Sequence, residues 1–248
     1  MTILVTGGTG TLGRPTVALL RAAGRDVRVF SRTLGADRAI GDLTTGEGLA
    51  EALVGVDTVL HLATTAGSKD VTQTRNLVEA SRAAGVRHLV YISIVGVDVV
   101  PYSYYRAKLA SERLIEGSGI PFTILRASQF HSFLSAFVTM QRRLPMILAI
   151  DAPDQPIAAE EVARRLADLA LGEPAGRVAD IAGPEQLRLK DAIAIWQRHA
   201  GTRKPVWTIP LFGRTIRTFR DGAHMTGLPG FGRETFEEYA KREARGGA

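Results

Sequence analysis

The sequence predicts an α/β fold, a doubly wound parallel sheet followed by a small C-terminal portion. Two observations predict it. Through about the first 150 residues, short β-branched segments alternate with helical stretches, which is the pattern of a parallel sheet covered by helices. Gly24, Gly85 and Gly117 directly follow helical stretches, where glycine ends a helix at little cost by adopting a left-handed conformation.

The individual elements follow from this alternation. The predicted strands are Thr2–Thr6, Asp26–Phe30, Thr58–Leu62, His88–Ile92 and Phe122–Leu125. The predicted helices between them are Leu12–Ala23, Gly48–Leu53, Asp70–Ala84 and Tyr104–Gly117. Later elements are helices at Phe130–Arg143, Ala158–Leu171, Lys190–Ala200 and Glu234–Ala244, and Val178–Ile181 as one more strand that returns to the sheet. We therefore expect a core in residues 1–128 and a further portion in residues 129–248.

Composition excludes several classes of protein. The 248 residues contain no cysteine, so disulfides, thiolate-bound metals and a cysteine nucleophile are excluded. Apolar segments such as Leu144–Ile150 fall far short of the roughly 18 residues of a membrane helix, and the N-terminus lacks the basic stretch of a signal peptide. The net charge of +6 lies mostly in residues 1–150 without a dense basic run. We therefore expect a cytoplasmic globular protein that binds neither membranes nor nucleic acid.

The glycine-rich segment Thr6–Gly13 follows the first strand and leads into a helix. Gly7 permits a tight turn, Gly10 lets a pyrophosphate approach the backbone, and Gly13 lets the helix pack against the strand. The helix N-terminus then offers N–H groups and a positive dipole end to phosphates. This context predicts a dinucleotide site, whose loop contacts are Gly7, Thr9, Gly10, Thr11, Leu12 and Gly13.

The end of the second strand distinguishes between the dinucleotides. An NAD site carries a carboxylate there for the ribose 2′-hydroxyl, but this strand ends in Ser31 and Arg32. A guanidinium and a hydroxyl suit a 2′-phosphate, so NADP(H) is predicted in preference to NAD(H). The alternatives are that Arg32 is only a solvated loop residue and that nearby Asp37 supplies the missing carboxylate.

With the motifs Thr6–Gly13, Gly41-Asp42-Leu43, Leu62-Ala63-Thr64 and Tyr104-x-x-x-Lys108, the sequence resembles an atypical short-chain dehydrogenase/reductase of the NmrA-like, NAD(P)-binding family. The resemblance covers roughly residues 1–130. It implies a Rossmann-type fold in which Asp42 and Leu43 flank the adenine. It also implies that Ala63 and Thr64 line the cofactor path, that Lys108 contacts the nicotinamide ribose, and that residues 126–130 border the substrate cleft.

Tyr104 and Lys108 are the predicted catalytic pair. Four residues apart on a helix, they share a face, and a nearby ammonium would lower the pKa of a tyrosine that acts as a general acid or base. Tyr102 and Tyr105 are neighbouring competitors for the role. The family pattern usually orients the carbonyl with the second of two successive serines, yet here Ser93 is followed by Ile94. This departure weakens a carbonyl–alcohol proton-transfer mechanism.

Other residues carry weaker predictions. The candidates on the substrate side are Ser93, Ser128, Phe130 and His131. His61 is interpreted as a packed or cofactor-adjacent histidine, and the spacing of the histidines predicts no metal site. Arg214, Arg217 and Arg220 fit one solvated helix face. Aromatic residues beyond position 129 fit either the protein core or an apolar wall around a substrate.

These observations favour an enzyme, an NADP(H)-dependent oxidoreductase that reduces a small, largely apolar carbonyl or quinone. The alternative is a non-catalytic NADP-binding redox sensor of the NmrA type that acts through a regulatory protein partner. A nucleotide-sugar epimerase or dehydratase is a further alternative. A homo-oligomer is compatible with each hypothesis.

Overall fold

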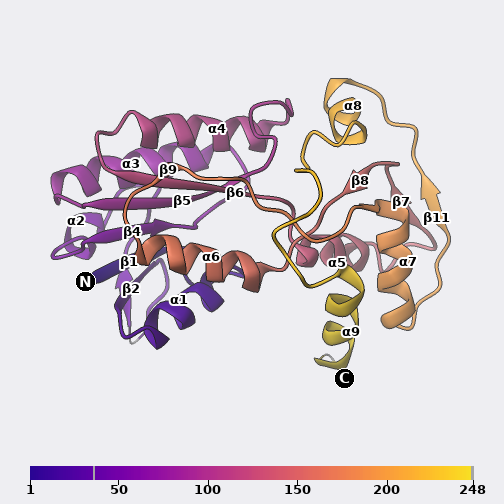
Figure 1. Ribbon diagram of the computed structural model, residues 1–248, viewed down its shortest axis with the longest axis horizontal. Coiled ribbons are helices and arrows are strands. Elements are labelled where there is room, and N and C mark those ends of the chain that lie inside the picture. The colour runs from indigo at the N-terminus through magenta and orange to yellow at the C-terminus, as the bar shows by residue number, and fades with distance from the viewer. Residues whose placement is uncertain (36, 247–248) are drawn as a thin grey trace. The chain divides into compact units, whose positions relative to one another are not determined.

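The computed structural model describes residues 1–35 and 37–246, which form two compact units (Figure 1). The first unit contains Met1–Ser93, Tyr102–Arg126 and Glu160–Ala179. The second contains Ile94–Pro101, Ala127–Ala159 and the described residues from Asp180 onward. The predicted parts, residues 1–128 and 129–248, differ from these units because the segment Glu160–Ala179 belongs to the first unit.

Within the described residues, the first unit is built on a seven-stranded parallel sheet of the order β3-β2-β1-β4-β5-β6-β9. Its strands are β1 (Thr2–Thr6), β2 (Asp26–Ser31), β3 (Arg38–Ile40), β4 (Thr58–His61), β5 (His88–Ile94), β6 (Phe122–Ala127) and β9 (Gly176–Arg177). This order starts at a central β1 and runs outward in both directions, which confirms the predicted doubly wound, Rossmann-type sheet.

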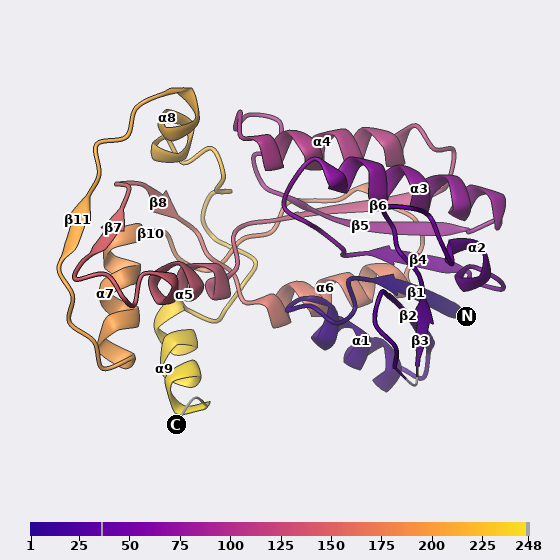
Figure 2. The same cartoon turned by 180° about the vertical axis from the view of Figure 1, so that it is seen from behind.

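Helices cover both faces of this sheet (Figures 1 and 2). On one face lie α3 (Lys69–Ala83) and α4 (Ser103–Glu116), and on the other lie α1 (Gly13–Ala22) and α6 (Ala159–Leu171). The short α2 (Leu49–Ala52) follows β3. The central strands are apolar on both faces, as expected for a parallel sheet between two helical layers. Their side chains form one core with α3 and α4, including Leu4, Val59, Leu77, Leu89, Ile115 and Ile124.

An ion pair is buried in the same unit, between β6 and α4. Arg126 donates through Nε and Nη2 to the two carboxylate oxygens of Glu112, at 2.9 and 2.7 Å. The side chains of Arg126 and Glu112 are only 4% and 2% exposed. Two parallel bonds of this kind satisfy both charges, which is the condition under which a buried ion pair is tolerated.

The second unit contains α5 (His131–Met140), α7 (Leu189–His199), α8 (Arg214–Arg220) and α9 (Phe236–Gly246). Strands β7 (Ile147–Ala149) and β11 (Val206–Thr208) pair in parallel, and β8 (Pro153–Asp154) and β10 (Leu187–Arg188) pair antiparallel. Leu134, Ala192, Phe236 and Tyr239 form a core between α5, α7 and α9. The three arginines at positions 214, 217 and 220 lie on α8, are exposed, and so fit the solvated helix face that their spacing predicts.

The predicted elements agree with the structure to within a few residues, and the exceptions are short. The strand that returns to the sheet is Gly176–Arg177 and not the predicted Val178–Ile181, although the Val178 N–H still bonds to the Ile124 carbonyl. Strands β3, β7, β8, β10 and β11 were not predicted. Each has two or three residues, too few for a strand to show an alternating pattern. Among the described residues, no helix is both long and apolar enough to cross a membrane.

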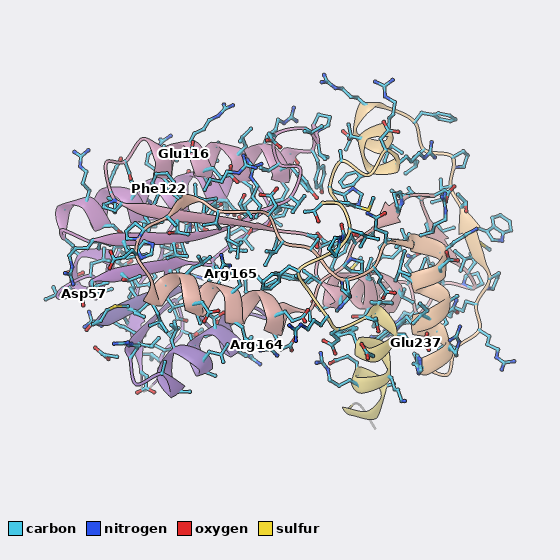
Figure 3. The ribbon with its side chains drawn as sticks, in the orientation of Figure 1. Asp57, Glu116, Phe122, Arg164, Arg165 and Glu237 are labelled. Carbon is cyan, nitrogen blue, oxygen red and sulfur yellow. The ribbon has the colours of Figure 1, made fainter. Side chains whose placement is uncertain are left out.

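The buried ion pair allows a test of this packing. Arg126→Met leaves the Glu112 carboxylate buried without its partner, so we expect the free energy of unfolding to fall by about 3–5 kcal/mol. Urea denaturation measures it. The double variant Arg126→Met/Glu112→Leu should recover much of the loss because no charge is then buried. The control is Arg87→Met, which removes an exposed partner of Asp57, labelled in Figure 3, and should change the midpoint little. An unchanged midpoint for Arg126→Met alone would contradict this account.

Candidate functional site

The candidate site lies where the strand order of the sheet reverses, between β1 and β4. Thr6 and His61, the last residues of these strands, are register partners, so the loops that follow them leave the sheet side by side. In open α/β sheets, ligands bind outside the carboxyl ends of the strands at such a reversal. The structure therefore places the loops at Gly7–Gly13 and Leu62–Thr65 at the expected position for a ligand.

Two glycines of the loop are required by close packing of backbone on backbone. Gly7 has a left-handed φ of 70°, and a Cβ there would lie 2.7 Å from the Ala63 nitrogen. A Cβ on Gly13 would lie 2.1 Å from the Gly7 carbonyl oxygen. Gly10 differs, since a Cβ there would meet only that same oxygen at 3.4 Å. Gly7 and Gly13 thus have structural reasons to be glycine, whereas the predicted reason for Gly10, close approach of a ligand, stays a prediction.

The loop presents backbone groups to solvent in front of α1. Thr9, Gly10 and Thr11 are exposed, while Leu12 and Gly13 are buried. Within this described segment, no side chain caps the start of α1 at Leu12. The Nε group of Arg14 donates to the Thr9 carbonyl at 2.8 Å and holds the loop to its helix. A helix start that has no side-chain cap and follows exposed residues is suited to receive a phosphate group.

Hydroxyl groups and two arginines gather at the end of β2. Ser31 and Thr33 share a hydrogen bond of 3.0 Å between their hydroxyls, and Arg32 is exposed beside them. Arg38 of β3, which the sequence did not single out, donates to the Thr33 hydroxyl at 2.9 Å. Asp37, the alternative carboxylate, is exposed and lies 3.6 Å from the Arg21 guanidinium. This end of the sheet therefore offers two guanidinium groups, and the Asp37 carboxylate faces a third.

The remaining residues predicted to contact the cofactor, Asp42, Leu43 and Ala63, all lie in the first unit. Asp42 accepts a hydrogen bond from the Thr44 N–H at 2.7 Å, and Leu43 is buried in the core. Ala63 is half-buried against the Gly7 backbone. Their predicted contacts with the adenine and along the cofactor path remain predictions.

A network of uncharged polar groups lies beneath the site. His61 bonds through Nδ1 to the Thr6 hydroxyl at 2.7 Å and through Nε2 to the Thr74 hydroxyl at 3.1 Å, and its ring stacks on Tyr91. Burial lowers the pKa of His61 to about 3, and the Lys108 charge adds to this effect, so the ring is neutral near pH 7. His61 is thus a packed histidine, as interpreted from the sequence. Within the described residues, no group of three His, Cys, Asp or Glu side chains could hold a metal.

Thr64 connects Tyr104 to a carboxylate that the sequence reasoning missed. The Thr64 Oγ1 atom lies 2.6 Å from Asp70 Oδ2 and 3.2 Å from the Tyr104 hydroxyl. The other oxygen of Asp70 accepts from the N–H and the hydroxyl of Thr65, both at 2.6 Å. Asp70 is 2% exposed. Its position at the start of α3, directly after the Thr64–Thr65 loop, is a signal that could have identified it.

Lys108 is placed differently from the predicted arrangement. Its Nζ atom donates to the Ile92 carbonyl at 3.1 Å and lies 4.7 Å from the centre of the Tyr91 ring. Burial lowers the pKa of Lys108 to about 8, against the opposing effect of Asp70. Burial, assisted by the Asp70 charge, raises the pKa of Tyr104 above its ordinary value. The expectation of a lowered tyrosine pKa is therefore wrong, because burial and the Asp70 charge outweigh the lowering effect of the Thr64 contact.

The substrate-side candidates fall in both units. Ser93 belongs to the first unit. Its hydroxyl is buried and has no hydrogen-bond partner among the described residues. The other three lie in the second unit. There Ser128 donates to the Gln155 carbonyl at 2.6 Å, and His131 packs between the rings of Phe236 and Tyr239. Phe130 is half-buried just before α5. Their roles toward a substrate stay predictions.

Comparisons with known proteins agree with this site. A (4-alkanoyl-5-oxo-2,5-dihydrofuran-3-yl)methyl phosphate reductase of Streptomyces griseus is 30% identical over 213 residues, 80% of this chain and 74% of the relative. Photosystem II assembly factor Ycf39 of Trieres chinensis is 27% identical over 234 residues, 86% of this chain and 73% of the relative. The quinone oxidoreductase QOR2 of Escherichia coli, solved with NADPH, shares the fold with a TM-score of 0.82 at 19% identity, covering 97% of this chain and 99% of that chain.

The family model described as NAD(P)H-binding matches residues 7–170, which include the glycine loop, the reversal of strand order and the Thr64–Tyr104 contact. This confirms the resemblance to the atypical short-chain dehydrogenases/reductases that the motifs indicate. The protein therefore belongs to the NAD(P)H-binding family.

Proposed function

We propose that the protein is an NADPH-dependent reductase of a small, largely apolar carbonyl or quinone. The observation that carries the proposal is the composition of the site at the carboxyl ends of β1 and β2. A backbone cradle at Gly7–Gly13 is followed by the hydroxyls of Ser31 and Thr33 and the guanidiniums of Arg32 and Arg38. The names of the Streptomyces and Escherichia relatives, a reductase and a quinone oxidoreductase, support the same class of reaction.

The preference for NADPH rests on charge at the end of β2. A 2′-phosphate brings an extra negative charge and additional acceptor oxygens, which guanidinium groups recognise through paired hydrogen bonds. Arg32 is exposed there, and Arg38 already lies on the Thr33 hydroxyl. Asp37 would oppose a phosphate, but the Arg21 guanidinium offsets its charge. The local balance is therefore positive, as a 2′-phosphate requires.

Each group of residues in the site has its own proposed role. Gly7, Thr9, Gly10, Thr11, Leu12 and Gly13 would hold the pyrophosphate, and Asp42, Leu43, Ala63 and Thr64 would line the adenine and nicotinamide path. The bound dinucleotide supplies the hydride. Lys108 would hold the ribose, and its charge would favour the anionic oxygen that forms on the substrate. Tyr104, kept protonated near neutral pH by its raised pKa, would give that oxygen a proton.

A protonated tyrosine fits reduction better than oxidation. Reduction of a carbonyl needs a proton donor, whereas oxidation of an alcohol needs a base, and a neutral phenol with a raised pKa is a poor base. A quinone makes smaller demands, since its reduced oxygens are weaker bases than an alkoxide and take protons from water. Ser93, Ser128, Phe130 and His131 would then contribute mainly to the shape of the substrate site.

A second candidate is a non-catalytic, NADP-binding sensor that acts through a partner protein. Two observations favour it. Ile94 occupies the position where the family usually has its second serine, and the Lys108 ammonium is bonded to the Ile92 carbonyl. The relative from Trieres chinensis is named an assembly factor and not an enzyme. Both candidates need the same cofactor site, so only turnover separates them.

We expect NADPH to bind at least tenfold more tightly than NADH in a titration followed by cofactor fluorescence. Arg32→Ala and Arg38→Ala should each weaken NADPH binding about tenfold, because each removes a charged hydrogen bond worth roughly 1.5–3 kcal/mol, and should leave NADH binding unchanged. Arg25→Ala is the matched control, since Arg25 is equally exposed but precedes β2 at the opposite end of the strand. Equal affinities for NADPH and NADH in the unaltered protein would contradict the proposed preference.

We expect oxidation of NADPH above the uncatalysed rate with at least one acceptor from a panel of quinones, enones and aromatic aldehydes. Tyr104→Phe should lower kcat about 10²–10⁴-fold for a carbonyl, the usual contribution of a general acid, and much less for a quinone. Tyr102→Phe, an exposed neighbour, is the control. Turnover that Tyr104→Phe leaves unaffected on carbonyls would remove the tyrosine from the mechanism. No turnover with any acceptor, despite tight NADPH binding, would favour the sensor.

A further inference from the structure

Asp70 is a buried carboxylate in the candidate site that none of the predicted roles uses. It is 2% exposed and accepts three hydrogen bonds of 2.6 Å, from the Thr64 hydroxyl, the Thr65 hydroxyl and the Thr65 N–H. Its charge acts on Lys108, whose pKa it raises against the effect of burial. A buried anion is costly, so each of these bonds stabilises the fold of the Thr64–Thr65 loop.

The bonds of Thr64 fix the direction of its contact with Tyr104. A threonine hydroxyl has one hydrogen and two lone pairs. The carboxylate can only accept, and at 2.6 Å it takes that hydrogen. The Ala66 N–H donates to Thr64 Oγ1 at 3.0 Å and occupies one lone pair. Because Asp70 takes the single hydrogen of Thr64, the 3.2 Å contact with Tyr104 is a hydrogen bond only when the phenol donates to the second lone pair.

We propose that Asp70 is a positioning residue: by taking the hydrogen of Thr64, it makes the threonine oxygen an acceptor that holds and orients the Tyr104 hydroxyl. The inference rests on the proposed function, in which Tyr104 delivers a proton to the substrate. In this arrangement the phenolic hydrogen points to Thr64. A bond of 3.2 Å between neutral groups is weak, and the negative oxygen that develops on a substrate is the stronger acceptor. Tyr104 is thus held in place without being committed to Thr64.

Other charged or titratable groups face this chain and could act on the same phenol. Lys108 has its Nζ atom 6.0 Å from the centre of the Tyr104 ring, and the Tyr105 ring lies 6.4 Å away. His61 and Tyr91 also sense the Asp70 charge, and both are neutral near pH 7. None of these groups bonds to Thr64 in the described hydrogen-bond network, so a test at Thr64 separates the proposed chain from them.

The direction of the Thr64–Tyr104 bond can be measured by titrating Tyr104. With 3-fluorotyrosine incorporated, ¹⁹F NMR resolves the five tyrosines, and Tyr104→Phe assigns the signal. Fluorination makes the phenol a stronger acid, which keeps the titration below strongly alkaline pH. Thr64→Val should lower the pKa of Tyr104, because only the neutral phenol donates to Thr64 and that form loses a bond. If Thr64 were the donor, the same substitution would raise the pKa. A rise or no change overturns the proposal.

Asp70→Asn tests the carboxylate itself. The asparagine can still accept from Thr65, so the loop is kept, but its NH₂ group donates to Thr64 and turns the threonine hydrogen toward Tyr104. We expect the Tyr104 titration to shift downward by about one pH unit, which corresponds to a tenfold change in its acidity. Asp57→Asn is the control, since that carboxylate also accepts from a backbone N–H, of Thr2, outside the site. Loss of the Asp70 charge alone also lowers the pKa of Tyr104, so this shift supports the chain only beside a downward shift in Thr64→Val, and no shift in Asp70→Asn overturns the proposal.

Turnover gives a second readout. Thr64→Val and Asp70→Asn should each lower kcat for a carbonyl acceptor at least tenfold, and Thr64→Ser should restore kcat. In Asp70→Asn, KM and the NADPH dissociation constant should stay within twofold. Equal losses in NADPH affinity and kcat would indicate a merely structural role and overturn the proposal. If the unaltered protein reduces no acceptor, the proposed function fails, whereas the ¹⁹F titration still decides the role of Asp70.

Discussion

The site depends on the close approach of three backbone segments that lack side chains where they meet. The start of α1, the end of β1 and the loop after β4 come together at Gly7 and Gly13, where a Cβ would lie 2.1–2.8 Å from neighbouring backbone atoms. This contact brings the exposed residues 9–11 to the point where the strand order reverses. Every other group of the site is positioned relative to that cradle, either from the next strand ends or from the helices behind them.

The buried polar groups next to the cradle include a chain of uncharged side chains. Thr6, His61 and Thr74 form a neutral chain of hydrogen bonds, and burial keeps the histidine unprotonated. Asp70 and Lys108 carry charge beside this chain, each with hydrogen bonds to neighbouring groups. A low local dielectric strengthens such interactions, which is why a single carboxylate can influence a tyrosine one threonine away.

The sequence predicts the central sheet, its covering helices and the glycine loop because periodicity and glycine spacing are local signals. It does not reveal Asp70, whose partner Tyr104 lies on another helix, nor Arg38, which reaches Thr33 only after the chain turns back into β3. The predicted lowering of the Tyr104 pKa is wrong for a related reason. The spacing of Tyr104 and Lys108 shows that they share a helix face, but it gives no measure of burial, which is the main cause of the raised pKa of Tyr104. Two-residue strands lack any periodic signal, so contacts between distant segments alone create them.

The chain passes from one compact unit to the other five times, after Ser93, Pro101, Arg126, Ala159 and Ala179. Neither unit is a continuous stretch of sequence. The second unit therefore cannot be exchanged as one continuous cassette. A chain cut after residue 128 would lack α6 and β9, which cover one face and one edge of the cofactor-binding sheet. Changes of specificity among relatives must therefore arise by local substitution within a continuous architecture.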